Sequence, residues 1–284
     1  MIGYLLNLIG FDMSFVNNFL QFVFDKIGYQ VLRTERYKKL NEIEIANSFN
    51  DNTLVIRVLN LLSIIEKIDK IYFGDLIRAL KISKSQLGQD IFVLSVLGFK
   101  RNGFFVEFGS TNGVDYSNTL VMEKIFGWKG ILSEPAKTWH RHLSLNRNSF
   151  IERKAVWKDS DSKLIFNETD QAEYSTISHF SDLDMHKATR LQGKKYNVET
   201  ISLNDLLLKY SAPTVIDYLS IDTEGSEIDI LESFDFNCYT FSVITVEHNY
   251  TEARIRIYDL LTSKGYRRVN EDISQFDDWY VYGV

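Results

Sequence analysis

Apolar residues recur along this chain at two different spacings, and the change falls near residue 85. Before it, apolar side chains follow the three- and four-residue spacing of an amphipathic helix, at Leu54, Val55, Val58, Leu61, Leu62 and Ile65. No proline interrupts residues 1–84. The pattern therefore predicts an α-helical N-terminal region over residues 1–84 and a separate domain over residues 85–284.

Beyond residue 85, short apolar runs typical of buried strands alternate with amphipathic runs typical of helices. The predicted strands are Phe104–Phe108, Gly130–Ser133, Glu152–Val156, Ile216–Ile221, Phe241–Val246, Tyr266–Val269 and Trp279–Tyr282. The predicted helices are Asn118–Phe126, Thr138–Leu145, Leu203–Tyr210, Ser226–Phe234 and Ala253–Lys264. This order predicts a Rossmann-like α/β fold with a mostly parallel sheet. The last two strands lack a helix between them, so we expect an antiparallel hairpin at the C-terminal edge.

Residues 167–197 break this alternation. They are polar, show no clear period, and form a stretch too long for an ordinary connection. Two interpretations stay open for them, a cover over the active site or a disordered loop.

Charge and composition exclude several classes. The net charge of −6 argues against a broad nucleic-acid-binding surface. The single cysteine, Cys238, excludes an internal disulfide, and we expect it as a buried thiol in a reducing compartment. No apolar run is long enough for a membrane helix. The apolar residues 1–24 lack basic residues, so we expect them to pack on the catalytic body or a partner rather than on a membrane surface.

The segment Gly103–Gly113 carries the strongest signal for chemistry. A strand ending at Phe108 is followed by two glycines, Gly109 and Gly113, and then by a polar helix start. Strand, glycine turn and helix N-terminus together bring backbone N–H groups close to a cofactor. Glu134 ends the next strand, where a carboxylate can accept hydrogen bonds from both ribose hydroxyls of a nucleoside.

The choice of nucleoside cofactor depends on the glycine spacing and on Glu107. A nicotinamide site would normally show G-x-G-x-x-G, whereas this turn has one glycine pair. Glu107 would also repel a pyrophosphate. S-adenosylmethionine carries a sulfonium and an ammonium group, and both suit a site lined with carboxylates. The sequence thus favours S-adenosylmethionine.

At these motifs the chain resembles the FkbM-type S-adenosylmethionine-dependent methyltransferases, from about Ser85 to the C-terminus. The resemblance is carried by the segments Ser85–Asp90, Gly103–Gly113, Ser117–Thr119, Gly127–Pro135, Tyr218–Glu227, Val246–Asn249 and Asp277–Tyr280. It implies a Rossmann-like methyltransferase sheet and O-methylation of a hydroxyl, on a sugar of a glycan or polysaccharide or on a secondary metabolite. It also implies a set of cofactor-binding residues: Gln89 at the methionine end, Glu107, Gly109, Ser110, Gly113, Glu134, and Ala155 against the adenine.

Methyl transfer to a hydroxyl near neutral pH needs a base or a Lewis acid. His248 is the expected base because its ordinary pKa lies near neutrality, and Asp222 is the second expected catalytic residue. Alternatively, Asp222, Glu247 and His248 end neighbouring strands and could bind Mg²⁺, Mn²⁺ or Zn²⁺ together. Glu224 is left as a possible acceptor contact.

Other functions stay open at this point. The enzyme could methylate the nitrogen of an amino sugar or amine, or the fold could serve as a catalytically inert binding scaffold. Residues 1–84 could form a homo-oligomer, dock the enzyme to a partner, or cover the acceptor site. We expect a cytoplasmic protein, at the periphery of membrane-associated glycan assembly. The group Asp277–Trp279 either closes the acceptor pocket or forms a plain edge-strand turn.

Overall fold

The computed structural model describes residues 52–181 and 187–283. By its contacts the chain divides into two units, residues 1–55 and 56–284, and the second carries the sheet. Helix α4 (Asn52–Ile65) confirms the helix predicted from Leu54 to Ile65. The predictions for residues 1–51 lie outside the described residues. The division at residue 84 and the role assigned to residues 1–84 stay predictions.

A seven-stranded sheet forms the centre of the second unit, in the order β10-β11-β9-β8-β1-β2-β3 among the described residues. Its strands are β1 (Phe104–Phe108), β2 (Lys129–Ser133), β3 (Phe150–Glu152), β8 (Val215–Ile221), β9 (Thr240–Glu247), β10 (Tyr266–Val269) and β11 (Asp277–Tyr282). The strands from β9 to β3 pair in parallel, whereas β11 pairs antiparallel with both β9 and β10. The mostly parallel sheet with an antiparallel edge hairpin is thereby confirmed.

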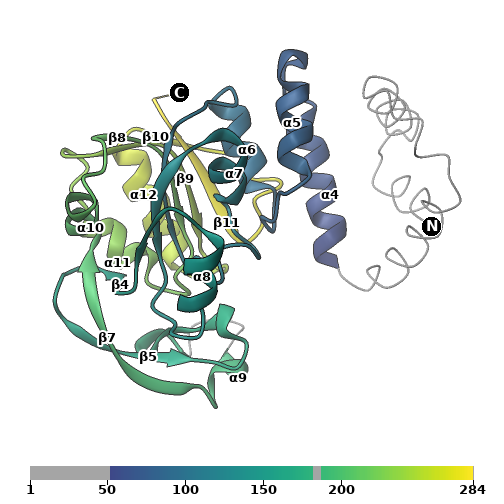
Figure 1. Ribbon diagram of the computed structural model, residues 1–284. Helices are drawn as coiled ribbons and strands as arrows, with labels where there is room; N and C mark the ends of the chain where they lie inside the picture. Colours follow the sequence, from purple (N-terminus) through teal and green to yellow (C-terminus); the bar gives the residue numbers. More distant parts are fainter. Residues whose placement is uncertain (1–51, 182–186, 284) are drawn as a thin grey trace, which may run out of the picture. The chain divides into compact units, whose positions relative to one another are not determined.

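Helices cover both faces of this sheet (Figure 1). One group comprises α6 (Gln89–Val96), α7 (Leu120–Phe126) and α8 (His140–Asn146), and the other comprises α10 (Leu203–Lys209), α11 (Glu227–Glu232) and α12 (Ala253–Ser263). Before them come the short η2 (Lys70–Tyr72) and α5 (Phe73–Leu80). The strands are apolar almost throughout because both faces are buried, as in other parallel sheets. Their side chains, such as Val106, Leu219 and Ile244, are fully buried.

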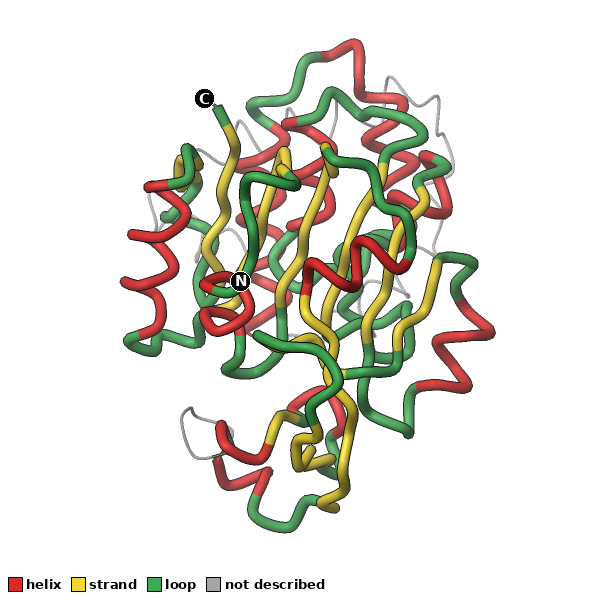
Figure 2. Tube along the Cα trace, turned by 90° about the vertical axis from the view of Figure 1, so that its left-hand side faces the viewer, coloured by secondary structure: helices red, strands yellow, loops and turns green. Residues whose placement is uncertain are grey.

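A second, smaller sheet occupies the region where the sequence showed no period. It has the order β4-β7-β5-β6, with strands β4 (Ala155–Trp157), β5 (Lys163–Glu168), β6 (Thr176–Ile177) and β7 (Lys194–Ser202). Single turns η3 (Ala172–Tyr174) and η4 (Ser178–Phe180) and helix α9 (Lys187–Arg190) connect its strands. Figure 2 shows this sheet beyond one end of the large one. The disordered-loop interpretation of residues 167–197 is therefore wrong for the part that is described.

The strand predicted at Glu152–Val156 is also corrected. Its two ends belong to different sheets, since β3 pairs with β2 and β4 pairs with β7. The strand is interrupted at Arg153 and Lys154, where one carboxylate oxygen of Glu152 accepts hydrogen bonds from both backbone N–H groups. That cap satisfies the two donors which would otherwise continue a ladder.

Two smaller expectations are settled by the fold. No helix among the described residues is long and apolar enough to cross a membrane. Cys238 is exposed rather than buried, because it lies in the turn before β9, where its thiol contacts Asp235.

Candidate active site

The C-terminal ends of β1, β2, β8 and β9 meet at one edge of the large sheet, which is where ligands bind in open α/β folds. Each of these strands ends in, or is directly followed by, an acid that is buried or, for Asp222, half-buried. They are Glu107 in β1, Glu134 after β2, Asp222 after β8 and Glu247 at the end of β9. Asp277, the first residue of β11, lies opposite Glu247 in the antiparallel register. Five carboxyl groups, four of them buried and that of Asp222 half-buried, therefore lie along one edge.

The glycine turn after β1 joins the two halves of this edge. Gly109 has a φ of +71°, and a Cβ at this position would lie 2.1 Å from the backbone oxygen of Asp222. Only glycine allows β1 and β8 to end in such close contact. Gly113 has a φ of +79°, and its Cβ would collide with Arg147 and Leu143. Gly113 thus lets the turn pack on helix α8 and the residue after it.

Ser110 and Glu107 fix the shape of the turn from beneath. The hydroxyl of Ser110 donates to the backbone oxygens of Glu107 and Ser133, each at 3.2 Å. The Glu107 carboxylate accepts from the backbone N–H of Asn118 at 2.7 Å and from the hydroxyls of Ser117 and Thr119. Contact of these residues with a cofactor stays a prediction, and what the structure gives them is a role in positioning the turn.

A buried arginine completes the surroundings of Glu107. A guanidinium nitrogen of Arg147 lies 3.7 Å from the Glu107 carboxylate, and Nε of Arg147 lies 3.0 Å from Glu123. Burial raises the pKa of Glu107, and Arg147 opposes the shift, together with hydrogen bonds from Thr119, Asn118 and Ser117. Glu107 is thus an acid with its own cation and its own donors.

Glu134 is held by the backbone. Its two carboxylate oxygens accept from the N–H groups of Thr111 and Ala136, each at 2.8 Å. Burial raises the pKa of Glu134 to about 7, although these hydrogen bonds lower it. The carboxylate lies between the glycine turn and the end of β2, which is the position predicted for the ribose-binding acid. The ribose contact itself stays a prediction.

Two further predicted cofactor residues lie at opposite sides of the edge. Gln89 begins α6 and donates through Nε2 to the Asp277 carboxylate at 2.9 Å. Ala155 begins β4 and packs with Ala136, Phe166 and Val198 in a small apolar cluster that extends from the end of β2. Such a surface suits the face of an adenine, but this contact also stays a prediction.

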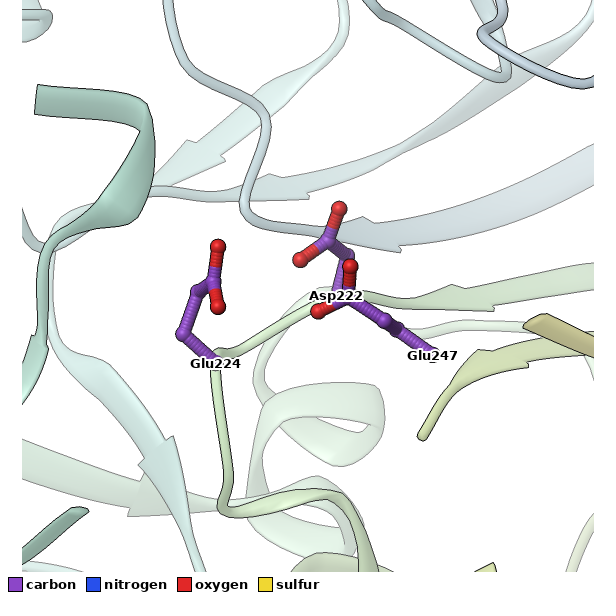
Figure 3. A group of neighbouring side chains, drawn as sticks. All are labelled: Asp222, Glu224 and Glu247. Carbon is purple, nitrogen blue, oxygen red and sulfur yellow. The ribbon is translucent and has the colours of Figure 1, made fainter. Parts of the chain in front are cut away.

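Three carboxyl groups come together at the ends of β8 and β9. Ligand atoms of Asp222, Glu224 and Glu247 lie within 4.8 Å of one another (Figure 3). Oε2 of Glu247 is buried and finds no hydrogen-bond partner in residues 52–181 and 187–283. Among the described residues, no Lys, Arg or His forms an ion pair with Asp222, Glu247 or Asp277. Carboxyl oxygens suit a hard divalent cation, so this trio could hold one.

The imidazole of His248 does not belong to this trio, which corrects the predicted metal set of Asp222, Glu247 and His248. Nδ1 of His248 accepts from the backbone N–H of Tyr250 at 3.0 Å, and Nε2 lies 3.7 Å from the Asp278 carboxylate. Asp278 is itself bound by Arg254 through two hydrogen bonds, at 2.8 and 3.0 Å. Nε2 of His248 has no hydrogen-bond partner among the described residues, and Glu224 takes the third place among the acids.

The acids Asp222, Glu247 and Asp277 at β8, β9 and β11 have raised pKa values. Burial raises the pKa of Asp222 to about 7 and that of Asp277 to about 8. Burial, followed by the charge of Asp222, raises the pKa of Glu247 well above its usual range. Burial lowers the pKa of His248 to about 4, against the attraction of Asp278. The imidazole is consequently neutral at pH 7, and the acids there share protons.

A family model then decides the class of protein. The model of the methyltransferase FkbM domain matches residues 107–268, more than half of the chain. The chain belongs to the FkbM methyltransferase family. It is an S-adenosylmethionine-dependent methyltransferase, and the implied cofactor fits the acid-lined edge because the molecule carries two cationic groups.

Solved structures resemble this methyltransferase at low sequence identity. A precorrin-6y C5,15-methyltransferase from Geobacter metallireducens is 9% identical with a TM-score of 0.40, covering 72% of this chain and 92% of that chain. A TehB-like SAM-dependent methyltransferase from Corynebacterium glutamicum is 8% identical with a TM-score of 0.35, covering 75% of this chain and 94% of that chain. None of the curated proteins compared with this methyltransferase matches it.

The small sheet of this methyltransferase reaches the acid trio through residues that the sequence did not reveal. Arg190 of α9, itself buried, forms an ion pair with Glu224 at 2.8 Å. Thr176 of β6 donates to the backbone oxygen of Glu224 at 2.8 Å. Phe180 lies against Gly225, whose φ is +122°. No local pattern marks Arg190, whereas Glu224 was recognisable as one of the acids following β8.

Proposed function

We propose that this methyltransferase transfers a methyl group from S-adenosylmethionine to a hydroxyl of a sugar in a glycan or polysaccharide. The observation that carries the proposal is the close pair formed by the half-buried Asp222 and the buried Glu247. A carboxyl group whose pKa is raised to about 7, as that of Asp222 is, is partly ionised at neutral pH and can accept a proton from a hydroxyl, and a positioned base contributes about 10²- to 10⁴-fold. The secondary-metabolite hydroxyl is the other acceptor that the same chemistry serves.

We assign the base to Asp222 and a positioning role to His248. When bound, S-adenosylmethionine supplies the methyl group and a neutral thioether leaving group. Asp222 would take the proton of the acceptor hydroxyl, and Glu247 beside it would share that proton. His248 is neutral and its Nδ1 accepts from the backbone N–H of Tyr250, so we assign it the support of the loop after β9 rather than contact with the acceptor.

An exposed aromatic side chain supports a sugar as acceptor. Tyr250 follows the end of β9 by three residues, is 59% exposed, and its ring lies 5.4 Å from that of His248. Its φ of 57° is unusual for a bulky residue, and such strain clusters at functional sites. Aromatic rings beside hydrogen-bonding carboxylates suit the apolar faces and hydroxyls of a pyranose.

N-methylation of an amino sugar or amine is the second candidate. The observation that favours it is the absence of ion-pair partners for Asp222, Glu247 and Asp277 within the described part of the chain. Buried acids without a cation also attract an ammonium group. The acceptor test below distinguishes the two.

Labelled methyl transfer to paired acceptors tests the proposal. Cell-surface glycans and nucleotide sugars would be offered beside their amino-sugar counterparts, with S-adenosylmethionine labelled in the methyl group. We expect label on hydroxyl oxygens. Label only on amines would favour the second candidate, and label on neither class would refute the sugar proposal.

A divalent cation, Mg²⁺ or Mn²⁺, is the further cofactor that the trio Asp222, Glu224 and Glu247 could bind. The pairing of Glu224 with Arg190 leaves two carboxylates free of a cation. Titration with EDTA decides the matter. Activity that is lost and then restored by Mg²⁺ or Mn²⁺ would add the metal to the mechanism, and full activity would leave Asp222 acting alone.

We also propose that the enzyme works in the cytoplasm, beside membrane-associated glycan assembly, and that residues 1–84 dock it there or form a homo-oligomer. This placement rests on the proposed glycan acceptor. Fractionation of cells expressing the full chain and a chain beginning at Ser85 would test it. Identical distribution and identical size of the two proteins would refute a docking or oligomerising role.

A further inference from the structure

One polar residue stands out in the apolar run of helix α4. Asn60 lies between Leu59 and Leu61, is only 3% exposed, and is among the poorer helix formers. A buried amide costs free energy unless both its hydrogens find acceptors. Its presence in an apolar helix face therefore needs a reason other than helix stability.

The amide of Asn60 joins two segments that are remote in sequence. Its Nδ2 donates to the backbone oxygen of Ile273 at 2.8 Å and to that of Leu87 at 3.2 Å. Both of its hydrogens are thereby used. The first segment precedes β11, and the second precedes α6, so one side chain fixes the spacing between them.

The same two segments carry the polar groups at one side of the acid edge. Gln89 follows Leu87 by two residues, and its Oε1 accepts from the backbone N–H of Leu87 at 2.9 Å. Asp277 follows Ile273 by four residues, and its backbone N–H donates to Ser274 at 2.9 Å. Gln89 and Asp277 then meet through their own 2.9 Å hydrogen bond. The two segments are thus joined twice, by the amide of Asn60 and by the hydrogen bond between Gln89 and Asp277.

Close packing holds α4 against these two segments. Gly88 has a φ of +89°, and a Cβ there would lie 3.1 Å from Leu61 and 3.4 Å from Ile64. The helix thus packs directly on the residue next to Gln89. The segment before β11 also supports the loop after β9, since the backbone oxygen of Phe276 accepts from His248 N–H at 2.8 Å.

We infer that Asn60 is a positioning residue for the cofactor site, which sets the Gln89–Asp277 hydrogen bond from the second layer of side chains. The inference rests on the proposed role of Gln89 at the methionine end of the cofactor. It gives helix α4 a part in the site itself, beyond docking or oligomerisation.

Asn60→Leu in the full chain tests this, because leucine keeps the volume and removes both donors. Calorimetry should show that the Kd for S-adenosylmethionine rises about tenfold, as expected for two buried carbonyls left without donors. Asn204→Leu is the matched control, since Asn204 also joins a helix to a loop, at Asp235, away from the edge. Its Kd should stay within about twofold of wild type.

A double-mutant cycle separates positioning from plain destabilisation. Gln89→Leu should raise the Kd alone, and adding Asn60→Leu should raise it little further, because both remove one unit. Fully additive effects, or an unchanged Kd in Asn60→Leu, would overturn the inference. If the wild-type enzyme binds no S-adenosylmethionine, the proposed site fails instead. In that case, faster hydrogen exchange at residues 86–90 and 270–277 in Asn60→Leu, but not in Asn204→Leu, would still support the positioning role of Asn60. Unchanged exchange would refute that role.

Discussion

Glu107 and Glu247 are the same kind of residue at the same edge of one sheet, yet their surroundings differ. Glu107 has a buried arginine, two hydroxyls and a backbone N–H directed at its carboxylate. Glu247 has Asp222 and Glu224 as neighbours, and its Oε2 has no hydrogen-bond partner within the part of the chain that the structure describes. In the half of the edge built from β1 and β2, each acid has its own hydrogen-bond donors, whereas in the half that β8 and β9 form, Asp222 and Glu247 have no ion-pair partner among the described residues.

This difference assigns different work to the two halves. Satisfied groups hold a backbone shape, and the glycine turn at β1 needs such a frame to present its N–H groups. Buried acids without partners raise the free energy of the unliganded protein, and the binding of a cation or a proton lowers it. We therefore expect the first half to govern stability and the second half to govern chemistry.

The largest effect should come from Asp222→Asn. Loss of the proposed base should lower kcat by about 10²- to 10⁴-fold, while the affinity for S-adenosylmethionine changes only a few-fold. Steady-state kinetics and calorimetry would measure the two quantities. Asp161→Asn is the control, an exposed aspartate paired with Lys154. If the kcat of Asp222→Asn stays within tenfold of wild type, Asp222 is not the base.

Glu107→Gln should act on stability instead. The amide would point its own N–H groups at donors, namely the hydroxyls of Ser117 and Thr119 and the guanidinium of Arg147. Unfolding in urea should show a loss of about 3 kcal/mol, because a buried charge-assisted network loses its acceptor. If instead the variant is as stable as wild type, Glu107 is no anchor of the turn.

The opposite sign is expected for the stability of Asp222→Asn. The folded pKa of Asp222 is about 7, against 3.8 for the free side chain. The folded state therefore holds the proton more tightly, and wild-type stability falls as the pH rises from about 4 to about 7. At pH 8 the variant should be more stable than wild type by about 2 kcal/mol, and at pH 3.5 the two should be equal. A variant less stable at both pH values would show that Asp222 is satisfied after all.

The large sheet could be predicted from sequence because its signal is local. The buried strands β1, β2, β8 and β9 are apolar runs that end in, or are followed by, an acid or a glycine, and the predicted runs match these strands within one residue at each end. The small sheet could not be predicted, because β5 and β7 are half exposed and mix lysine, glutamate and apolar residues. Their pairing depends on contacts across the chain rather than on a period.

The acids of the site could be placed at the edge, but not their partners. Asp222 and Glu247 were identified since strand ends are visible in sequence. Three contacts join residues that lie 34 to 188 positions apart in the sequence: Arg147–Glu107, Arg190–Glu224 and Gln89–Asp277. Only the fold brings them together, and they decide which carboxylate is neutralised and which is left for a ligand.

The smallest effect should come from His248→Gln. Glutamine can still accept from Tyr250 N–H and donate toward Asp278, so kcat should fall less than tenfold. The pH profile makes the test sharper. If Asp222 is the base, activity rises with pH through about 7 in both proteins, because the carboxyl group must lose its proton to act. If His248 is the base, the rise lies near its own pKa of about 4 and disappears in the variant. An unchanged rise near pH 7 would assign the reactive proton to Asp222 and leave His248 with a positioning role.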